Sequence, residues 1–189
     1  MVYLLDRDFA RQRTLIVRVA AILLLAEWVS HAAPHSLLSL ADLVHPAGIG
    51  LILLGVAVRS WAAGYLIKSK SLTTTGPYAV IRHPLYFGSL LLMLGFGLTL
   101  EDGLAITAVI VLFGILYLPA IIREEQRLSR TYGDHWISYI EQTGMLWPKG
   151  WRINSVNGWH WDLWVRNKEW ACVVVSALFL SALQMASWI

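Results

Sequence analysis

Charged residues are scarce in this sequence. Asp, Glu, Lys and Arg make up 14% of its 189 residues, against about 25% in a typical soluble domain. A soluble protein of this size needs more charge to cover its surface, so the composition argues against that class. Hydrophobic residues account for 57% of the chain, which is typical of a protein embedded in lipid.

Cysteine and the common cofactor-binding motifs are also missing. The single cysteine, Cys172, excludes a disulfide framework or a cysteine metal cluster within one chain. The sequence has no phosphate-binding loop, no dinucleotide fingerprint and no nucleophile elbow. No two histidines stand four residues apart on a predicted helix, as a helical zinc site requires. We therefore expect no metal site.

Long apolar stretches are abundant. A helix that crosses a membrane needs about 20 mostly apolar residues. The segments that meet or approach this length are 14–31, 47–67, 86–100, 104–122 and 170–188. None alternates apolar and polar residues as a barrel strand does. The sequence thus predicts an all-α polytopic membrane protein of about five transmembrane helices, forming a single transmembrane domain over 1–189.

The basic residues predict how these helices are oriented. Of the 15 lysines and arginines, all but Arg18 and Arg59 lie outside the apolar segments, and all of those fall on one side if five segments cross. The positive-inside rule makes that side cytoplasmic. We expect a protein of the cell or inner membrane with its N-terminus in the cytoplasm and its C-terminus outside. This pattern explains the net charge of +3 without a nucleic-acid partner. The first segment lacks a small residue two positions before Ala33, so we expect a retained span rather than a cleaved signal peptide.

Arg59 lies about two turns inside its predicted span. An ionisable residue within a membrane is a functional candidate by default, so Arg59 is a candidate substrate-binding residue. Snorkelling to the interface or a structural ion pair is the alternative interpretation.

The connections predict local structure at the cytoplasmic face. The third and fourth spans are joined by so few residues that they must form a helical hairpin. Gly76-Pro77 and His83-Pro84 make 73–83 extended or turning, with Pro84 in the first turn of the next helix. The residues after 122 mix charged and apolar side chains, which predicts one or two cytoplasmic amphipathic helices that end near Gly133 and Gly144.

The region 149–189 holds a tryptophan-rich segment and the final span. Tryptophan is concentrated between 147 and 170. Its ring prefers the membrane interface, so an interfacial belt is one interpretation. The other is a wall of a pocket for an apolar substrate.

Two groups of polar residues flank the predicted hairpin on its cytoplasmic side. Tyr78, Arg82, His83 and Tyr86 precede it, and Glu124-Glu125 follow it. Each group alone is compatible with a membrane anchor or a solvated helix. Together they offer a cation for a carboxylate and carboxylates for an ammonium group or ribose hydroxyls.

The spacing of these residues resembles a known family of membrane enzymes. The sequence contains G-x-Y, R-H-P-x-Y-x-G, E-E-x-x-L and Y-G-x-x-W-x-x-Y in that order around the hairpin. The residues that carry these motifs are Gly76, Tyr78, Arg82, His83, Pro84, Tyr86, Gly88, Glu124, Glu125, Leu128, Tyr132, Gly133, Trp136 and Tyr139. Over about 70–148 the chain is similar to the isoprenylcysteine carboxyl methyltransferase family and its phospholipid methyltransferase relatives.

The resemblance implies an integral membrane methyltransferase that uses S-adenosylmethionine (SAM), with 70–148 as its cofactor-binding core. The implied cofactor-binding residues are Tyr78, Arg82, His83, Tyr86, Glu124 and Glu125. Of these, His83 and Glu125 are the implied catalytic residues. Arg123 is a candidate for steering an acidic acceptor. Trp147 stands where many relatives carry an arginine before a proline, so it joins Arg59 and Arg123 as a candidate substrate-binding residue.

A lipid or small apolar molecule with a carboxyl, amine or thiol group is the expected acceptor, because it can enter from the surrounding membrane lipids. Two other functions remain open. Membrane sterol-type reductases that use NADPH have a similar R-H-P-x-Y segment, but they are longer and need cations for the cofactor phosphates. A non-catalytic membrane subunit that keeps a degenerate pocket is the second alternative. The sequence does not predict an oligomeric state.

Overall fold

The computed structural model describes residues 43–67, 71–100, 103–150 and 158–186. The expected first span, 14–31, lies outside these residues. The described elements are α2 (Val44–Ala63), the 3-10 helix η1 (Gly76–Ala79), α3 (Pro84–Thr99), α4 (Gly103–Leu112), the π-helical segment η2 (Phe113–Tyr117), α5 (Leu118–Tyr132), α6 (Asp134–Gln142), α7 (Trp161–Arg166) and α8 (Glu169–Ala186). The described residues thus form helices and no strand, as the sequence predicts.

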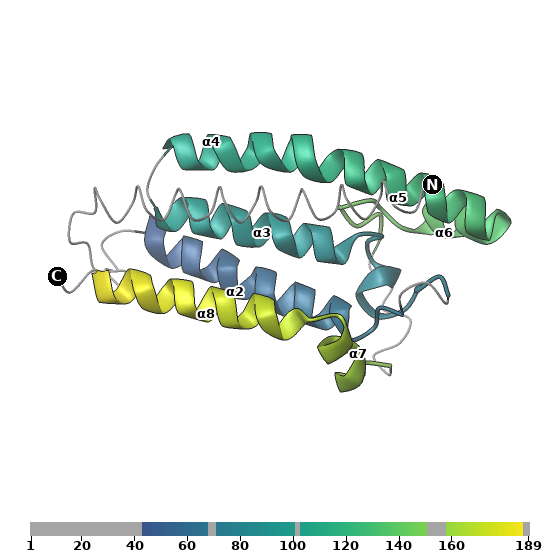
Figure 1. Ribbon diagram of the computed structural model, residues 1–189. Coiled ribbons are helices and arrows are strands. Elements are labelled where there is room, and N and C mark those ends of the chain that lie inside the picture. The colour runs from purple at the N-terminus through teal and green to yellow at the C-terminus, as the bar shows by residue number, and fades with distance from the viewer. Residues whose placement is uncertain (1–42, 68–70, 101–102, 151–157, 187–189) are drawn as a thin grey trace, which may run out of the picture.

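The long helices lie side by side in the order α8, α2, α3 and α4 (Figure 1). Helix α2 packs closely on α3 because glycines line their contact. A Cβ atom added to Gly95 would lie 2.7 Å from the carbonyl oxygen of Gly48, and one added to Gly55 would lie 2.8 Å from that of Gly88. Small residues let helix backbones approach in a membrane, where the hydrophobic effect does not drive helices together.

The predicted hairpin is present. Helix α3 ends at Thr99, α4 begins at Gly103, and the two helices pack against each other. The predicted start of this hairpin is also confirmed, because α3 begins with Pro84 in its first turn and His83 caps it in a non-helical conformation. Proline is tolerated there since the first amides of a helix have no intrahelical acceptor.

Helices α4, η2 and α5 form one continuous helix over Gly103–Tyr132. Its middle widens into a π turn in which the amide of Leu118 donates to the carbonyl of Phe113, five residues earlier. Pro119 explains the widening, because it has no amide proton and its ring clashes with the carbonyl four residues before it. The helix ends at Gly133, whose φ of 51° favours glycine. The amphipathic α6 follows, as predicted.

Two of the described helices, Val44–Ala63 and Gly103–Tyr132, are long and apolar enough to cross a membrane. The apolar helices Pro84–Thr99 and Glu169–Met185 are shorter. Large side chains such as Leu53, Ile110 and Leu178 are exposed on these helices. The total of five spans stays a prediction.

The polar segments gather at one end of the bundle. The C-terminal end of α2, the start of α3, the end of α5, the start of α8 and the short helices η1, α6 and α7 all lie there (Figure 1). Residues from four parts of the chain can therefore meet at this end.

Candidate functional site

Backbone hydrogen bonds fix the segment that carries Arg82 and His83. The amide of Arg82 donates to the carbonyl of Gly144 over 2.8 Å, and that of His83 donates to the carbonyl of Met145 over 3.2 Å. Ile81 and Gly144 form an isolated parallel bridge. The segment after α6 is thus tied to the entrance of α3, which holds both side chains in place.

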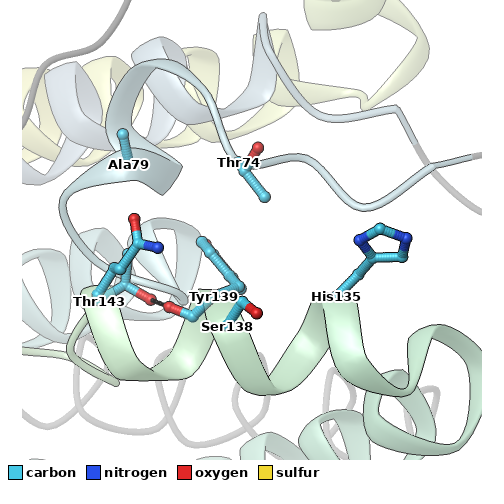
Figure 2. A pocket seen from close by; sticks show the side chains of 7 residues that line it. Thr74, Ala79, His135, Ser138, Tyr139 and Thr143 are labelled. Atoms are coloured by element: carbon cyan, nitrogen blue, oxygen red, sulfur yellow. Dashed lines mark hydrogen bonds between the residues drawn. The ribbon is translucent and has the colours of Figure 1, made fainter.

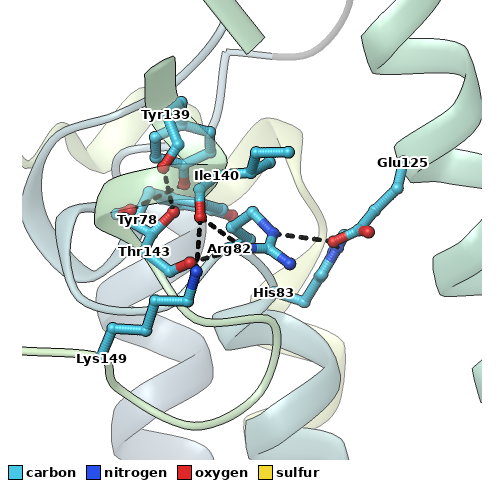
Figure 3. A network of polar contacts seen from close by, with 8 residues as sticks. All are labelled: Tyr78, Arg82, His83, Glu125, Tyr139, Ile140, Thr143 and Lys149. Atoms are coloured by element: carbon cyan, nitrogen blue, oxygen red, sulfur yellow. Dashed lines mark hydrogen bonds and ion pairs between the residues drawn. The ribbon is translucent and has the colours of Figure 1, made fainter. Parts of the chain in front are cut away.

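Glu125 joins this segment to the long helix. Its Oε1 atom accepts a hydrogen bond from Arg82 Nε over 2.8 Å and lies 3.2 Å from His83 Nε2 (Figure 3). A neutral His83 that donates from Nε2 keeps Nδ1 as its acceptor. Figure 3 shows the second carboxylate oxygen of Glu125 pointing away from Arg82. The structure thus brings together three of the site residues that were predicted from the sequence.

Burial and charge set the protonation of Glu125. The side chain is 21% exposed, whereas that of Arg82 is 9% exposed. Partial burial opposes ionisation, but the hydrogen bonds from His83 and Arg82 outweigh it and hold the pKa of Glu125 below its ordinary value. Glu125 lies beyond the apolar part of its helix and is a carboxylate at neutral pH.

Arg82 also caps α6. Its Nη1 atom donates to the carbonyls of Thr143 and Ile140, the second over 3.4 Å. Lys149 Nζ donates to the carbonyl of Ile140 over 2.9 Å. The last carbonyls of a helix lack intrahelical donors and carry partial negative charge, which cations stabilise. Arg82 therefore links the segment before α3 to Glu125 on the long helix and to the C-terminal end of α6.

Two tyrosines lie beside this network (Figure 3). Tyr139 donates its hydroxyl to the carbonyl of Tyr78 over 2.7 Å. The Tyr78 hydroxyl is buried and has no hydrogen-bond partner among the residues that the structure describes. Burial, aided by the Glu124 carboxylate, raises the pKa of Tyr78 well above its ordinary value, so the phenol stays neutral. A buried hydroxyl without a partner is unfavourable, and a bound water or ligand relieves that cost.

Aromatic rings continue from His83 into the bundle. The His83 and Tyr86 rings are 5.6 Å apart, the Tyr86 and Tyr117 rings 5.9 Å, and the Tyr117 and Phe113 rings 4.9 Å. Tyr117 is absent from the residues predicted from the sequence. The signal that points to it is Pro119, because a proline within an apolar helix predicts a local shift in which side chains face inward.

Arg82, His83, Tyr86 and Glu125 are called the cluster below. The other predicted residues of this region lie around it. Glu124 is half-buried, and Arg123 is exposed on α5. Trp147 is 75% exposed, and its ring meets Phe87 edge to face at 6.3 Å. The substrate-binding roles of Arg123 and Trp147 stay predictions.

Arg59 lies in an ion pair within the bundle. Its Nε and Nη2 atoms donate to the two carboxylate oxygens of Glu169 over 2.8 and 3.0 Å. Its Nη1 atom donates to the Ser89 hydroxyl and to the carbonyl of Leu85. A structural ion pair is the alternative to a substrate role for Arg59, and the structure contains such a pair. Its substrate role stays a prediction.

A cavity of about 230 Å³ opens beside the cluster, between the segment before η1 and helix α6 (Figure 2). The lining residues are Thr74, Ala79, His135, Ser138, Tyr139, Gln142 and Thr143. Tyr139 and Thr143 belong to both the cavity wall and the network around Arg82. Among the residues described, no group of three or more His, Cys, Asp or Glu side chains is placed to hold a metal ion.

Comparisons with known proteins match the part of the chain that contains this site. A family model described as phospholipid methyltransferase matches residues 44–135. This range includes α2, the R-H-P-x-Y segment, the hairpin and the Glu124-Glu125 pair.

Two curated proteins are similar in sequence. The chain is 38% identical over 112 residues to the cobalt-zinc-cadmium resistance protein CzcN of Cupriavidus metallidurans, covering 56% of this chain and 51% of that protein. It is 30% identical over 148 residues to the nickel-cobalt-cadmium resistance protein NccN of Alcaligenes xylosoxydans xylosoxydans, covering 77% of this chain and 68% of that protein. The chain thus spans about half the length of the first relative and two thirds of the second. No solved structure matches the chain.

Proposed function

This chain belongs to the phospholipid methyltransferase family, and from that premise we propose that it is a SAM-dependent methyltransferase of a membrane. The observation that carries the proposal is the contact of Arg82 and His83 with Glu125 at the polar end of an apolar helical bundle. Family membership also favours methyl transfer over the NADPH-dependent reductase that the R-H-P-x-Y segment leaves open.

The side chains of the cluster fit the polar groups of SAM. One carboxylate oxygen of Glu125 points away from Arg82. It can accept hydrogen bonds from ribose hydroxyls or from an ammonium group. The buried Tyr78 hydroxyl supports a bound ligand, because it has no partner among the described side chains and backbone groups. When bound, SAM supplies a methyl group whose bond to the sulfonium sulfur breaks as an acceptor atom attacks the carbon.

His83 is the proposed base where the acceptor is an amine. An ammonium group must lose its proton before it attacks carbon. The imidazole of a neutral His83 has one ring nitrogen that can accept this proton. Glu125 is a weaker candidate, because Arg82 and His83 hold its pKa low. Its proposed role is to orient His83 and to hold the cofactor.

A lipid or small apolar acceptor is proposed because the cluster lies next to surfaces that suit lipid. Trp147 is exposed beside Phe87 at the start of α3, and tryptophan prefers the membrane interface. We place this end of the bundle in the cytoplasm, with the N-terminus inside and the C-terminus outside. Labelling of Lys149→Cys in a Cys172→Ser background tests this orientation, since reaction only from the outer side of the membrane contradicts it.

Methyl transfer is tested with SAM that carries a radiolabelled methyl group. Membranes that contain the chain are incubated with it and then separated into lipid, protein and small-molecule fractions. We expect label in the lipid or apolar small-molecule fraction, and a loss of about 100-fold or more for His83→Ala. The control is Glu141→Gln, which changes an exposed carboxylate on α6. No transfer above empty membranes into any fraction contradicts the proposal.

The names of the two relatives support a second, physiological proposal. Both are described as metal-resistance proteins, so we propose that methyl transfer by this chain contributes to tolerance of cobalt, zinc, cadmium or nickel. A deletion strain should grow less well with these ions, and wild type should restore growth where His83→Ala does not. Restoration by His83→Ala shows that tolerance needs no catalysis and favours a non-catalytic membrane subunit.

A further inference from the structure

Two layers of side chains connect α3 with the long helix. In the first layer His83 meets Glu125, with 3.2 Å between Nε2 and Oε1. In the second layer Tyr86 meets Tyr117, with 5.9 Å between ring centroids. Tyr86 follows His83 by three residues, so it lies about one helical turn further into the bundle. A polar contact is thus followed directly by an aromatic one.

The π turn brings Tyr117 into the second layer. Tyr117 is the last residue of η2, and Pro119 follows in the first turn of α5. Glu125 comes eight residues after Tyr117, which is about 12 Å along the helix. The chain therefore presents a carboxylate near the polar end and an aromatic ring two turns deeper in its apolar part.

The two tyrosine rings form a corner. The planes of Tyr86 and Tyr117 meet at 84°, and Phe113 stacks on Tyr117 with 8° between the planes. Phe113 is buried, whereas Tyr86 and Tyr117 are only half-buried. Phe113 thus covers one face of Tyr117, while both tyrosine residues are partly exposed. Perpendicular aromatic faces attract cations, and such corners make up the cages that bind methylated ammonium groups.

We propose that the Tyr86–Tyr117 corner binds the positively charged sulfonium of the methyl donor, which makes Tyr117 a further binding residue of the site. The inference rests on the proposed function. Glu125 takes the polar part of the donor near the cytoplasmic end, and the corner takes the charged centre where the helices become apolar.

The test separates charge recognition from packing. SAM is a sulfonium, whereas S-adenosylhomocysteine (SAH) is a neutral thioether with the same adenosyl and amino-acid groups. Calorimetry with purified protein in detergent gives the Kd of each ligand for the wild type, Tyr117→Phe and Tyr117→Leu. We expect Tyr117→Leu to lower the preference for SAM over SAH by about fivefold or more, as loss of a cation–π contact does. Tyr117→Phe keeps the ring and should keep the ratio within about twofold.

The control for aromatic packing is Phe96→Leu. The Phe96 ring contacts that of Phe179 near the other end of α3, with 4.4 Å between centroids and 59° between the planes. Its substitution should leave the SAM-to-SAH ratio unchanged. Where Tyr117→Leu does not give folded protein by circular dichroism and gel filtration, the pair Tyr86→Leu and Tyr86→Phe tests the same corner.

The outcomes are distinct. A Tyr117→Leu variant that loses affinity for SAM and SAH to the same extent shows that the ring only packs, and the inference is wrong. Wild-type protein that binds neither ligand contradicts the proposed function itself. Wild-type protein that binds both ligands, with a ratio unchanged in the leucine variants, overturns the inference and leaves the proposed function standing.

Discussion

Arg59 and Glu169 join α2 to α8 through a two-pronged ion pair, with 2.8 Å from Nε to Oε1 and 3.0 Å from Nη2 to Oε2. Glu169 is only 3% exposed. Arg59 also reaches the carbonyl of Leu85 in the first turn of α3. One side chain therefore holds α2, α3 and α8 together beside the segment that carries His83.

Removing one partner of this pair should destabilise the bundle strongly. Glu169→Ala leaves the Arg59 charge without its counter-ion, and breaking a buried pair costs about 3–5 kcal/mol. The double variant Arg59→Met/Glu169→Met removes both charges and should recover most of the loss. Thermal unfolding in detergent measures the order of stability. A double variant no more stable than Glu169→Ala contradicts this account of the pair.

The glycine contact between α2 and α3 predicts a sharp difference between two alanine substitutions. Gly95→Ala brings a Cβ within 2.7 Å of the Gly48 carbonyl oxygen, so we expect a loss of about 1–3 kcal/mol from overpacking. Gly50→Ala is the control, because nothing lies within 4 Å of its added Cβ. That change should be neutral or slightly stabilising, since alanine favours helix. Equal effects of the two substitutions in chemical unfolding would count against this packing.

The ion pair of Glu125 predicts a pH-dependent contribution to stability. The pKa of Glu125 is lower in the folded protein than its ordinary value of 4.5. The carboxylate therefore stabilises the fold fully above pH 4.5, and the contribution is lost as the pH falls through the lower folded value. The stability gap between wild type and Glu125→Gln should therefore narrow as the pH falls below 4.5. A gap that stays unchanged down to pH 3.5 rules out the ion pair as its source.

The buried hydrogen bond from Tyr139 to the carbonyl of Tyr78 predicts a smaller effect. Tyr139→Phe removes the donor and leaves a buried carbonyl without it, which costs about 1–3 kcal/mol. Tyr132→Phe, at the half-buried end of α5, is the matched control and should change the unfolding midpoint little. If both variants unfold at the wild-type temperature, the bond does not stabilise η1 against α6.

Local chemistry predicts part of this fold. Pro84 predicts where α3 begins because proline fits a helix most readily in its first turn, and Gly133 predicts where α5 ends. The short connection before α4 predicts the hairpin, which in turn brings Glu125 back to Arg82 and His83. Each of these inferences depends on neighbouring residues or on one short connection.

Contacts between distant residues are harder to predict. Arg59 requires a partner, but nothing near it in the sequence points to Glu169 at the start of α8. The pairing of Ile81 with Gly144 joins two short segments that have no strand pattern. Tyr117 is missed because the π turn shifts the helical period, so that counting in steps of 3.6 residues does not show which side chains face Tyr86.

Binding of SAM and SAH to purified protein, measured by calorimetry, tests the central claim most directly. We predict that wild type binds both ligands and that Glu125→Gln and Arg82→Ala weaken binding about tenfold or more, which corresponds to about 1.4 kcal/mol. Glu141→Gln and Arg166→Ala change exposed charges and should stay within about twofold of wild type. No binding of either ligand at millimolar concentration, by protein that is folded in lipid, would contradict the methyltransferase account and favour the reductase or the non-catalytic subunit.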